Sequence, residues 1–291
     1  MGVEQLPQIL INGLLLGGLY ALIAAGLSLV FGVMRVINFA HGEFVMLGGM
    51  VTYWLFVLYD VNPLVSFFVV LVGGLLLGAL VQALLIRRVV DAPPMMSLLL
   101  TFGMSFFLIG LGLFLWENIS RSVPAYGGSW RALGVAFPRM RMIAFGMSAL
   151  VIGAVFAFLR RTRLGKAVRA TAQHAEVAMT CGIDVARMRV IAFAMGIGMA
   201  TSAGALLVTI SAIDPQVGGL YILKAFAIVI LGGLGSLAGA LVGGLILGLT
   251  EVLGTFYVSS AVGQASAYLV LLIVLILRPG GLMGTAEKVR A

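Results

Sequence analysis

Charged side chains are scarce in this sequence of 291 residues: Asp, Glu, Lys and Arg make up 10% of it, whereas soluble domains carry about 25%. With 62% hydrophobic residues and a mean hydropathy of +1.18, the chain lacks the polar surface of a water-soluble protein. Its single cysteine, Cys181, excludes an intrachain disulfide framework. No cleavable signal peptide is expected, because the first apolar segment is too long and Lys and Arg are absent before Arg35.

Apolar stretches without any Asp, Glu, Lys or Arg occupy most of the chain. They cover residues 5–34, 44–59, 61–86, 92–116, 142–159, 190–213, 225–250 and 252–277. Most can cross a hydrocarbon core, which needs roughly 20 apolar residues per helix, so we predict an all-α polytopic membrane protein with about 8–10 transmembrane helices, broken or half helices included. The strands of a β-barrel are excluded because the runs do not alternate polar and apolar residues. We expect a single transmembrane domain over residues 1–291.

Lys and Arg gather in one loop, residues 160–189, which holds seven of the chain's 18 basic residues against two acidic ones. Because cytoplasmic loops of membrane proteins are enriched in Lys and Arg, we predict that this loop is cytoplasmic. Counting the spans from it places the N-terminus outside and the C-terminus in the cytoplasm. The same count makes residues 117–141 an external loop, although that loop carries four arginines.

Two short segments, residues 35–43 and 232–236, interrupt apolar runs and indicate broken or half helices. Irregular backbone at membrane depth persists only where protein or a water-filled path covers it, and interrupted segments in two halves of a chain indicate a transport pathway. The sequence Gly-Gly-Leu-Tyr occurs at residues 17–20 and again at 218–221. The pattern is compatible with an internal duplication.

The basic loop also contains an Ala-rich, helix-favouring stretch, residues 165–182. Lys166 and Arg169 share one helix face, and Gly182 stands where a C-terminal cap glycine is expected. We predict a short amphipathic helix here. Its basic face would either rest on anionic lipid or dock a soluble partner.

This loop resembles that of a known family. Glu176-Val177-Ala178, followed after three residues by Gly182, is similar to the E-A-A-x-x-x-G coupling-loop signature of ABC importer permeases, with valine in place of the first alanine. The flanking LGKAVRATAQ and GIDV resemble the same loop of branched-chain amino acid permeases of the LivH type. Earlier in the chain, GLSLVFGVM, INFAHGEF and MLG resemble that family too. The resemblance covers essentially the whole chain, including the Gly-rich block at 232–248.

The resemblance implies a permease subunit of an ATP-driven importer that carries branched-chain amino acids (Leu, Ile and Val) across the bacterial inner membrane. It implies as partners a second homologous permease subunit, two cytoplasmic ATPase subunits and a periplasmic substrate-binding protein. The coupling helix would insert into a groove on an ATPase. The residues that the resemblance assigns to this coupling are Gly165, Lys166, Arg169, Gln173, Glu176, Ala178, Gly182 and Asp184.

The chain itself contains no G-x-x-x-x-G-K-[ST] phosphate loop. We therefore expect a transport subunit rather than an enzyme, with no cofactor of its own, while ATP and magnesium are bound by the partner ATPases. The sequence pI of about 10.2 does not indicate nucleic-acid binding, because the positive charge lies at the predicted cytoplasmic edges of the membrane.

Five polar side chains interrupt the apolar runs and are candidates for the translocation path: Asn38, His41, Glu43, Lys224 and Glu251. Ionisable groups within a membrane are rare and mark functional positions. Structural alternatives remain: Asn38 as a helix cap, Glu43 at the cytoplasmic boundary, and Lys224 snorkelling near the outer end. A catalytic or metal site at His41 and Glu43 is disfavoured, because residues two apart lie on different helix faces.

Other functions stay open at this point. The same machinery would serve urea, short amides or another amino acid as cargo. A self-sufficient channel or secondary transporter would leave the predicted docking helix without a purpose. A membrane enzyme is disfavoured because no paired carboxylates or histidine cluster occur within one plausible site.

Overall fold

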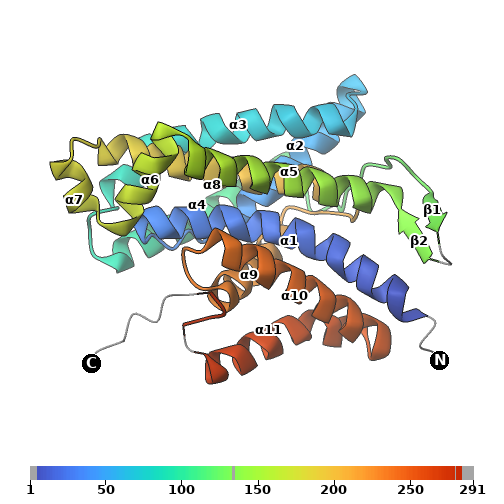
Figure 1. Cartoon of the computed structure of the whole chain (residues 1–291). Helices are drawn as coiled ribbons and strands as arrows, with labels where there is room; N and C mark the ends of the chain where they lie inside the picture. The colour runs from blue at the N-terminus through green and yellow to red at the C-terminus, as the bar shows by residue number, and fades with distance from the viewer. Residues whose placement is uncertain (1–4, 133–134, 279, 284–291) are drawn as a thin grey trace.

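The computed structural model describes residues 5–132, 135–278 and 280–283, and its helices run side by side in one bundle (Figure 1). Eight described helices are long and apolar enough to cross a membrane, and α9 is a shorter apolar helix, which confirms the all-α polytopic prediction. The elements are α1 (Leu6–Met34), α2 (His41–Tyr59), α3 (Pro63–Leu84), η2 (Ile86–Arg88), α4 (Pro94–Trp116), β1 (Ser129–Ala132), β2 (Val135–Pro138), α5 (Arg139–Arg161), α6 (Arg163–Gln173), α7 (Ala175–Thr180), α8 (Val185–Leu207), α9 (Val217–Gly232), α10 (Leu237–Tyr257) and α11 (Ser260–Leu277).

Glycines set how closely the central helices pack. A Cβ atom at Gly48 of α2 would overlap the backbone carbonyl of Thr201 in α8, and one at Gly17 of α1 would overlap the backbone of Leu245 in α10. In lipid, such close backbone approach drives helix association, because apolar side chains gain little by leaving an equally apolar solvent. Helices α1 and α8 form the buried centre of the bundle, whereas α4 and α11 expose most of their surface.

The interruption predicted at residues 35–43 is confirmed. Helix α1 ends at Met34, and the C-cap residue Arg35 adopts the left-handed conformation with φ 54°. The chain then turns back into the bundle, because His41 Nε2 lies 2.9 Å from the carbonyl oxygen of Ile23, eleven residues before the helix ends at Met34. At 1.5 Å per residue this is about 16 Å from the end of α1. Helix α2 therefore begins inside the bundle.

The interruption predicted at residues 232–236 is also confirmed, and it corrects the predicted span 225–250. That run is not one helix, because α9 and α10 are joined by a turn in which Gly233 has φ 98° and Gly235 has φ 81°. Ser236 then caps α10 by accepting a hydrogen bond of 3.0 Å from the backbone amide three residues later. A charge-free run does not reveal such a turn, which depends on glycine at left-handed positions and on a serine cap.

The predicted span 252–277 is also wrong. A turn divides it, since α10 ends at Tyr257 and Ser259 caps the start of α11. Helix α9 has 16 residues and is about 24 Å long, which is shorter than a hydrocarbon core of about 30 Å. It begins beside the start of α2, because a Cβ atom at Gly42 would overlap the carbonyl of Gly218. Two helices thus begin at the same depth inside the bundle.

The two ends of the bundle are built differently. The antiparallel hairpin of β1 and β2 lies at one end, where Gln8 of α1 exchanges two hydrogen bonds of 2.7 Å with the backbone of Ala136. Helices α6 and α7 project from the other end (Figure 1). The amide of Leu282, beyond α11, donates to the carbonyl of Leu231 in α9 at 2.8 Å. The described start of α1 and the end of α11 therefore lie at opposite ends.

One arginine of the loop at residues 117–141 has a clear structural role. The guanidinium carbon of Arg121 lies 5.1 Å from the ring centre of Tyr53 and 4.9 Å from that of Trp54, and Arg121 also donates to the carbonyl of Trp116 at 3.0 Å. Cation–π contacts of this kind stabilise an arginine at a partly buried position. Its occurrence in this loop therefore reflects packing and does not bear on membrane sidedness.

Candidate functional site

The basic loop forms a helical projection, as expected, but with two helices in place of one (Figure 1). Helix α6 begins after Thr162, whose side chain accepts a hydrogen bond of 2.9 Å from the amide of Gly165. It ends at His174, whose extended backbone (φ −149°, ψ 100°) separates it from α7. The expected continuous helix over residues 165–182 is thus wrong. Residues 173–175 contain no Gly or Pro, so the composition gives no signal for this break.

Two of the residues assigned to coupling shape the turn after α7. Gly182 has φ 77°, its amide donates to the carbonyl of Met179 at 2.9 Å, and the next amide, of Ile183, donates to Ala178 at 3.0 Å. This pair of hydrogen bonds is a Schellman motif, which confirms Gly182 as the expected cap glycine. Asp184 then caps α8 by accepting a hydrogen bond of 3.0 Å from a backbone amide.

The remaining assigned residues divide by exposure. Gly165 and Ala178 are buried against the bundle, and a Cβ atom at Gly165 would overlap the carbonyl of Phe158. The exposed residues, which can meet a partner, are Lys166, Arg169, Gln173 and Glu176. Arg189 of the same basic loop, which is not among the assigned residues, has an internal partner. Its guanidinium donates to both oxygens of Asp91 at 2.9 and 3.0 Å.

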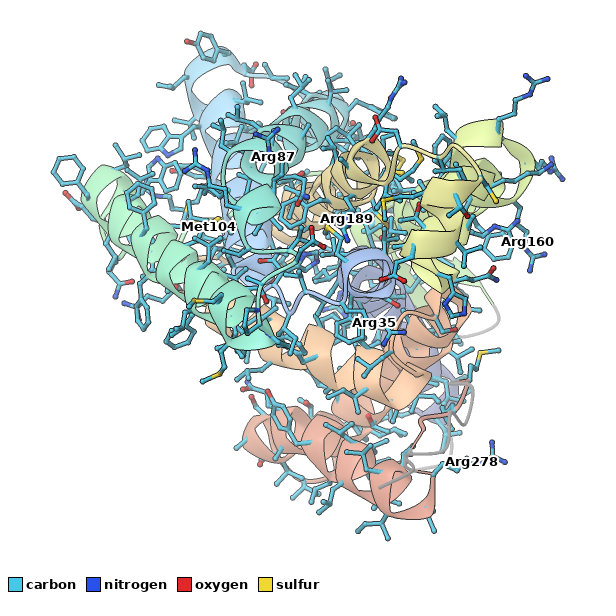
Figure 2. The ribbon with its side chains drawn as sticks, turned by 90° about the vertical axis from the view of Figure 1, so that its left-hand side faces the viewer. Arg35, Arg87, Met104, Arg160, Arg189 and Arg278 are labelled. Atoms are coloured by element: carbon cyan, nitrogen blue, oxygen red, sulfur yellow. The ribbon has the colours of Figure 1, made fainter. Side chains whose placement is uncertain are left out.

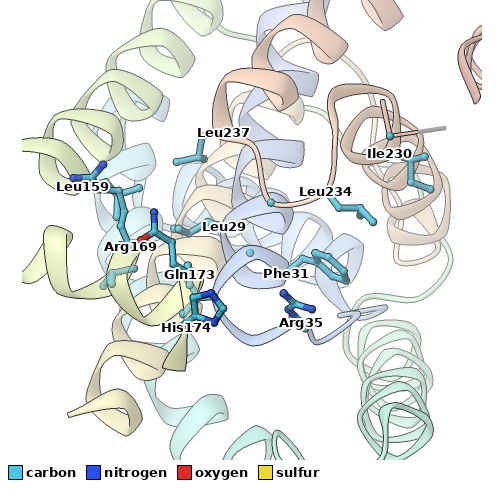
Figure 3. A pocket seen from close by; sticks show the side chains of 16 residues that line it. Leu29, Phe31, Arg35, Leu159, Arg169, Gln173, His174, Ile230, Leu234 and Leu237 are labelled. Carbon is cyan, nitrogen blue, oxygen red and sulfur yellow. The ribbon is translucent and has the colours of Figure 1, made fainter. Parts of the chain in front are cut away.

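This end of the bundle is rich in arginine. Figure 2, which looks onto it, shows Arg35 near the middle and Arg160 and Arg278 toward the edges. A cavity of about 930 Å³ opens here between α1, α6 and the α9–α10 turn (Figure 3). Its polar lining residues are Arg35, Arg169, Gln173 and His174, and apolar side chains, Leu29 and Leu237 among them, form its walls.

Lys224 and Glu251 lie together in the interior, although they are far apart in sequence. Lys224 Nζ donates to Glu251 Oε1 at 2.8 Å and Oε2 at 2.9 Å, and to the hydroxyl oxygen of Tyr20 at 2.8 Å. The Tyr20 hydroxyl in turn donates to Glu251 Oε1 at 3.1 Å. All three donors of the ammonium group are satisfied. The expected snorkelling of Lys224 is therefore wrong, because α1 and α10 supply partners that sequence position does not reveal.

The two Gly-Gly-Leu-Tyr segments meet at this ion pair. Tyr20 of α1 and Tyr221 of α9 have ring centres 6.2 Å apart, and the Lys224 ammonium lies 4.7 Å from the first ring centre and 5.7 Å from the second. The sequence singled out both tyrosines as part of a repeat but gave no sign of their common cation. The internal duplication itself stays a prediction.

The other three path candidates share the start of α2 and are buried. Glu43 Oε1 accepts a hydrogen bond of 3.1 Å from Ser105 of α4, a residue that the sequence did not single out. Asn38 does not cap α2, because the helix begins at His41 after Ala40, without a side-chain cap. Glu43 is likewise not at the boundary of the bundle, since α2 starts inside it. The structure thus places the five candidates in two groups. Lys224 and Glu251 form an ion pair, whereas Asn38, His41 and Glu43 share one segment but bond different neighbours, His41 the carbonyl of Ile23 in α1 and Glu43 the hydroxyl of Ser105 in α4.

Comparison with known proteins matches this arrangement. The model of a family described as branched-chain amino acid transport system / permease component matches residues 9–278. The chain is 31% identical to the high-affinity branched-chain amino acid transport system permease proteins LivH of Escherichia coli (strain K12) and BraD of Pseudomonas aeruginosa, with 96% of this chain and 96% of each relative covered. PsaBC from Streptococcus pneumoniae, solved in complex with Fab, shares the fold at a TM-score of 0.52 and 14% identity, covering 96% of this chain and 95% of that one.

Proposed function

The chain belongs to the family of branched-chain amino acid transport permease components, and from this premise we propose that it is the permease subunit of an ATP-driven (ABC) importer for Leu, Ile and Val. The observation that carries the proposal is the match over residues 9–278 to permease components, in a bundle with eight membrane-length apolar helices. The protein is a multi-pass membrane protein, and the bacterial inner membrane is the location that its relatives support.

In this proposal the α6–α7 projection is the element that an ATPase grips. Its exposed side chains offer both charges, with Lys166 and Arg169 on α6 and Glu176 at the start of α7. The Schellman turn at Gly182 fixes the angle between α7 and α8, and α8 runs through the buried centre of the bundle. A displacement of the projection is therefore transmitted through α8 to α1 and α2, both of which α8 contacts. Helix α1 carries Tyr20, a partner of Lys224, and α2 carries Glu43.

The proposed partners follow from this role. Two cytoplasmic ATPases bind ATP and magnesium, a second homologous permease subunit completes the membrane part, and a periplasmic binding protein delivers substrate. The α6–α7 end faces the cytoplasm, because cytoplasmic faces are rich in arginine and this end carries Arg35, Arg160 and Arg278 (Figure 2). The start of α1 then lies outside and the end of α11 inside.

Uptake by the complete transporter in proteoliposomes tests the proposal. We expect ATP-dependent uptake of labelled leucine, isoleucine and valine when the binding protein is present. Glu176→Lys should abolish uptake while membrane insertion is retained, because it reverses a charge on the docking surface. A matched control is Glu117→Lys, the same charge reversal at an exposed residue that follows α4, which should transport normally.

Three results would contradict parts of this proposal. Transport of urea or short amides in place of branched-chain amino acids would overturn the cargo. Uptake by the chain without ATPases would identify a channel or secondary transporter. Full uptake by Glu176→Lys would remove the coupling role from α7.

A further inference from the structure

The polar side chains at the start of α2 are incompletely paired. Asn38 and His41 are 0% exposed and Glu43 is 1% exposed. Among the described residues, no hydrogen-bond partner reaches either amide atom of Asn38, Nδ1 of His41 or Oε2 of Glu43. Buried polar atoms in proteins are nearly always paired, and an ionisable group at membrane depth usually has a function.

The Lys224–Glu251 cluster on the other side of α9 offers a contrast. Its ammonium, both carboxylate oxygens and the Tyr20 hydroxyl bond one another. Every polar atom of this network has a partner, and its carboxylate already pairs with a cation. Of the two intramembrane carboxylates, Glu43 is the one with a free oxygen.

Glu43 lies where three elements meet. It belongs to the first turn of α2, it accepts from Ser105 of α4, and its carboxylate fills the space that a side chain at Gly218 would need in the first turn of α9. The N-terminal turn of a helix favours negative charge, and the Glu43 carboxylate lies against the first turn of α9. A compact cation with several donors is the group that would complete the bonding of Glu43.

An aromatic group lies on the same three elements as this carboxylate, one turn before Ser105 on α4 and about two turns after Gly218 on α9. The ring of Phe39, just before α2, has its centre 5.7 Å from that of Phe102 on α4 and 5.3 Å from that of Phe226 on α9. Phe102 is 45% exposed, so the aromatic group reaches the surface between α4 and α9. A carboxylate and an aromatic wall on the same three elements match a ligand with an ammonium group and an aliphatic side chain.

Helix α4 can act as the cover of this site. It exposes most of its surface, and α2 is the helix with which it makes its main contact. Two side-chain hydrogen bonds join its polar face to the start of α2: Ser105 to Glu43 at 3.1 Å and Thr101 to the carbonyl of Ile37 at 2.9 Å. When α4 moves away from the start of α2, these bonds break and the carboxylate is uncovered.

We propose that Glu43 binds the α-ammonium group of the amino acid during its passage, with the aromatic group of Phe39, Phe102 and Phe226 taking the aliphatic side chain. This inference rests on the proposed function, and it adds a contact between permease and substrate at the meeting point of α2, α4 and α9.

The test is Glu43→Gln in the complete transporter with its binding protein. Glutamine keeps the size of the side chain and the acceptor for Ser105 but removes the charge. Leucine uptake should fall at least about tenfold, the worth of one charged hydrogen-bond partner, while assembly and ATP hydrolysis without substrate are retained. The matched control is Ser148→Ala on α5, another buried polar atom without a partner among the described residues, which should transport normally.

Each outcome of this experiment either supports or overturns the proposed role of Glu43. Wild-type leucine uptake by an assembled Glu43→Gln transporter overturns the inference and leaves the proposed function intact, whereas absence of leucine uptake by the wild type overturns the proposed function itself. If Glu43→Gln does not assemble, Glu43→Asp replaces it, because it keeps the charge but withdraws it by one methylene. A raised leucine concentration for half-maximal uptake then supports the contact, and an unchanged one overturns it.

Discussion

Replacing Lys224 with methionine should destabilise the protein strongly, because it opens the closed network between α1, α9 and α10. Lys224 Nζ bonds both oxygens of Glu251 at 2.8 and 2.9 Å and the Tyr20 hydroxyl at 2.8 Å. Methionine has a similar length and is apolar, so it fills the site but leaves the carboxylate of Glu251 without its cation. The prediction thus separates loss of charge pairing from loss of packing.

The magnitude follows from the burial of the pair. The side chains of Lys224 and Glu251 are 4% and 12% exposed, so water does not replace the lost partner. Removing one member of a buried ion pair costs about 3–5 kcal/mol, whereas replacing both by apolar residues is often neutral or stabilising. Large domains lose roughly 2–4 °C in Tm per kcal/mol, so Lys224→Met should lower Tm by on the order of 10 °C.

Thermal unfolding of the detergent-solubilised protein, followed by size-exclusion chromatography, measures this change. The double variant Lys224→Met, Glu251→Met should recover most of the loss, because it leaves no unpaired charge. Lys166→Met removes the same charge from an exposed position on α6 and should change stability by less than about 0.5 kcal/mol. A wild-type Tm for Lys224→Met, or a double variant whose loss equals the sum of the single ones, would refute the reasoning.

Two further predictions concern glycines. Gly182→Val should destabilise the turn after α7 by about 1–2 kcal/mol because φ is 77° there, and both Tm and leucine uptake should fall. Gly182→Asn tolerates this conformation and should retain the wild-type Tm and uptake. Equal behaviour of the two variants would show that the conformation is unimportant. Gly48→Ala should lower the free energy of unfolding by about 1–3 kcal/mol, because its Cβ would meet the Thr201 carbonyl in α8. Gly103→Ala on α4, where a Cβ meets open space, should leave Tm unchanged. An unchanged Tm for Gly48→Ala would contradict the close packing of α2 and α8.

Features that depend on neighbouring residues could be predicted from the sequence. The first helix was expected to end before Arg35, where the apolar run stops, and α1 ends there. The two interruptions were visible as a polar segment and as a glycine cluster. Gly182 was identified as a helix cap from its position after an Ala-rich stretch, and its backbone has the left-handed conformation that such a cap requires.

Features that depend on distant residues could not be predicted. The start of α2 was misplaced because the charge-free run begins only after Glu43, whereas the protein buries Glu43 within the first turn of the helix. Lys224 was expected to snorkel because its two hydrogen-bonding partners lie 27 and 204 positions away in the chain. The break at His174 has no local signal, since residues 173–175 contain neither Gly nor Pro. The coupling role of the exposed residues on α6 and α7 stays a prediction.

Helix α9 is held unequally on its two sides, and this asymmetry bears on how the bundle can open. On the side of α1 and α10 it is tied by a buried ion pair with every donor of Lys224 satisfied. On the side of α2 and α4, Glu43 has a single hydrogen bond, to Ser105, and one oxygen without a partner among the described residues. Separation on the first side would expose two charges to lipid, which is costly. Separation of α4 from the start of α2 breaks two hydrogen bonds with hydroxyl donors and uncovers a carboxylate that an ammonium group can then pair. The bundle should therefore open between α4 and α2 while α9 stays fixed to α1 and α10.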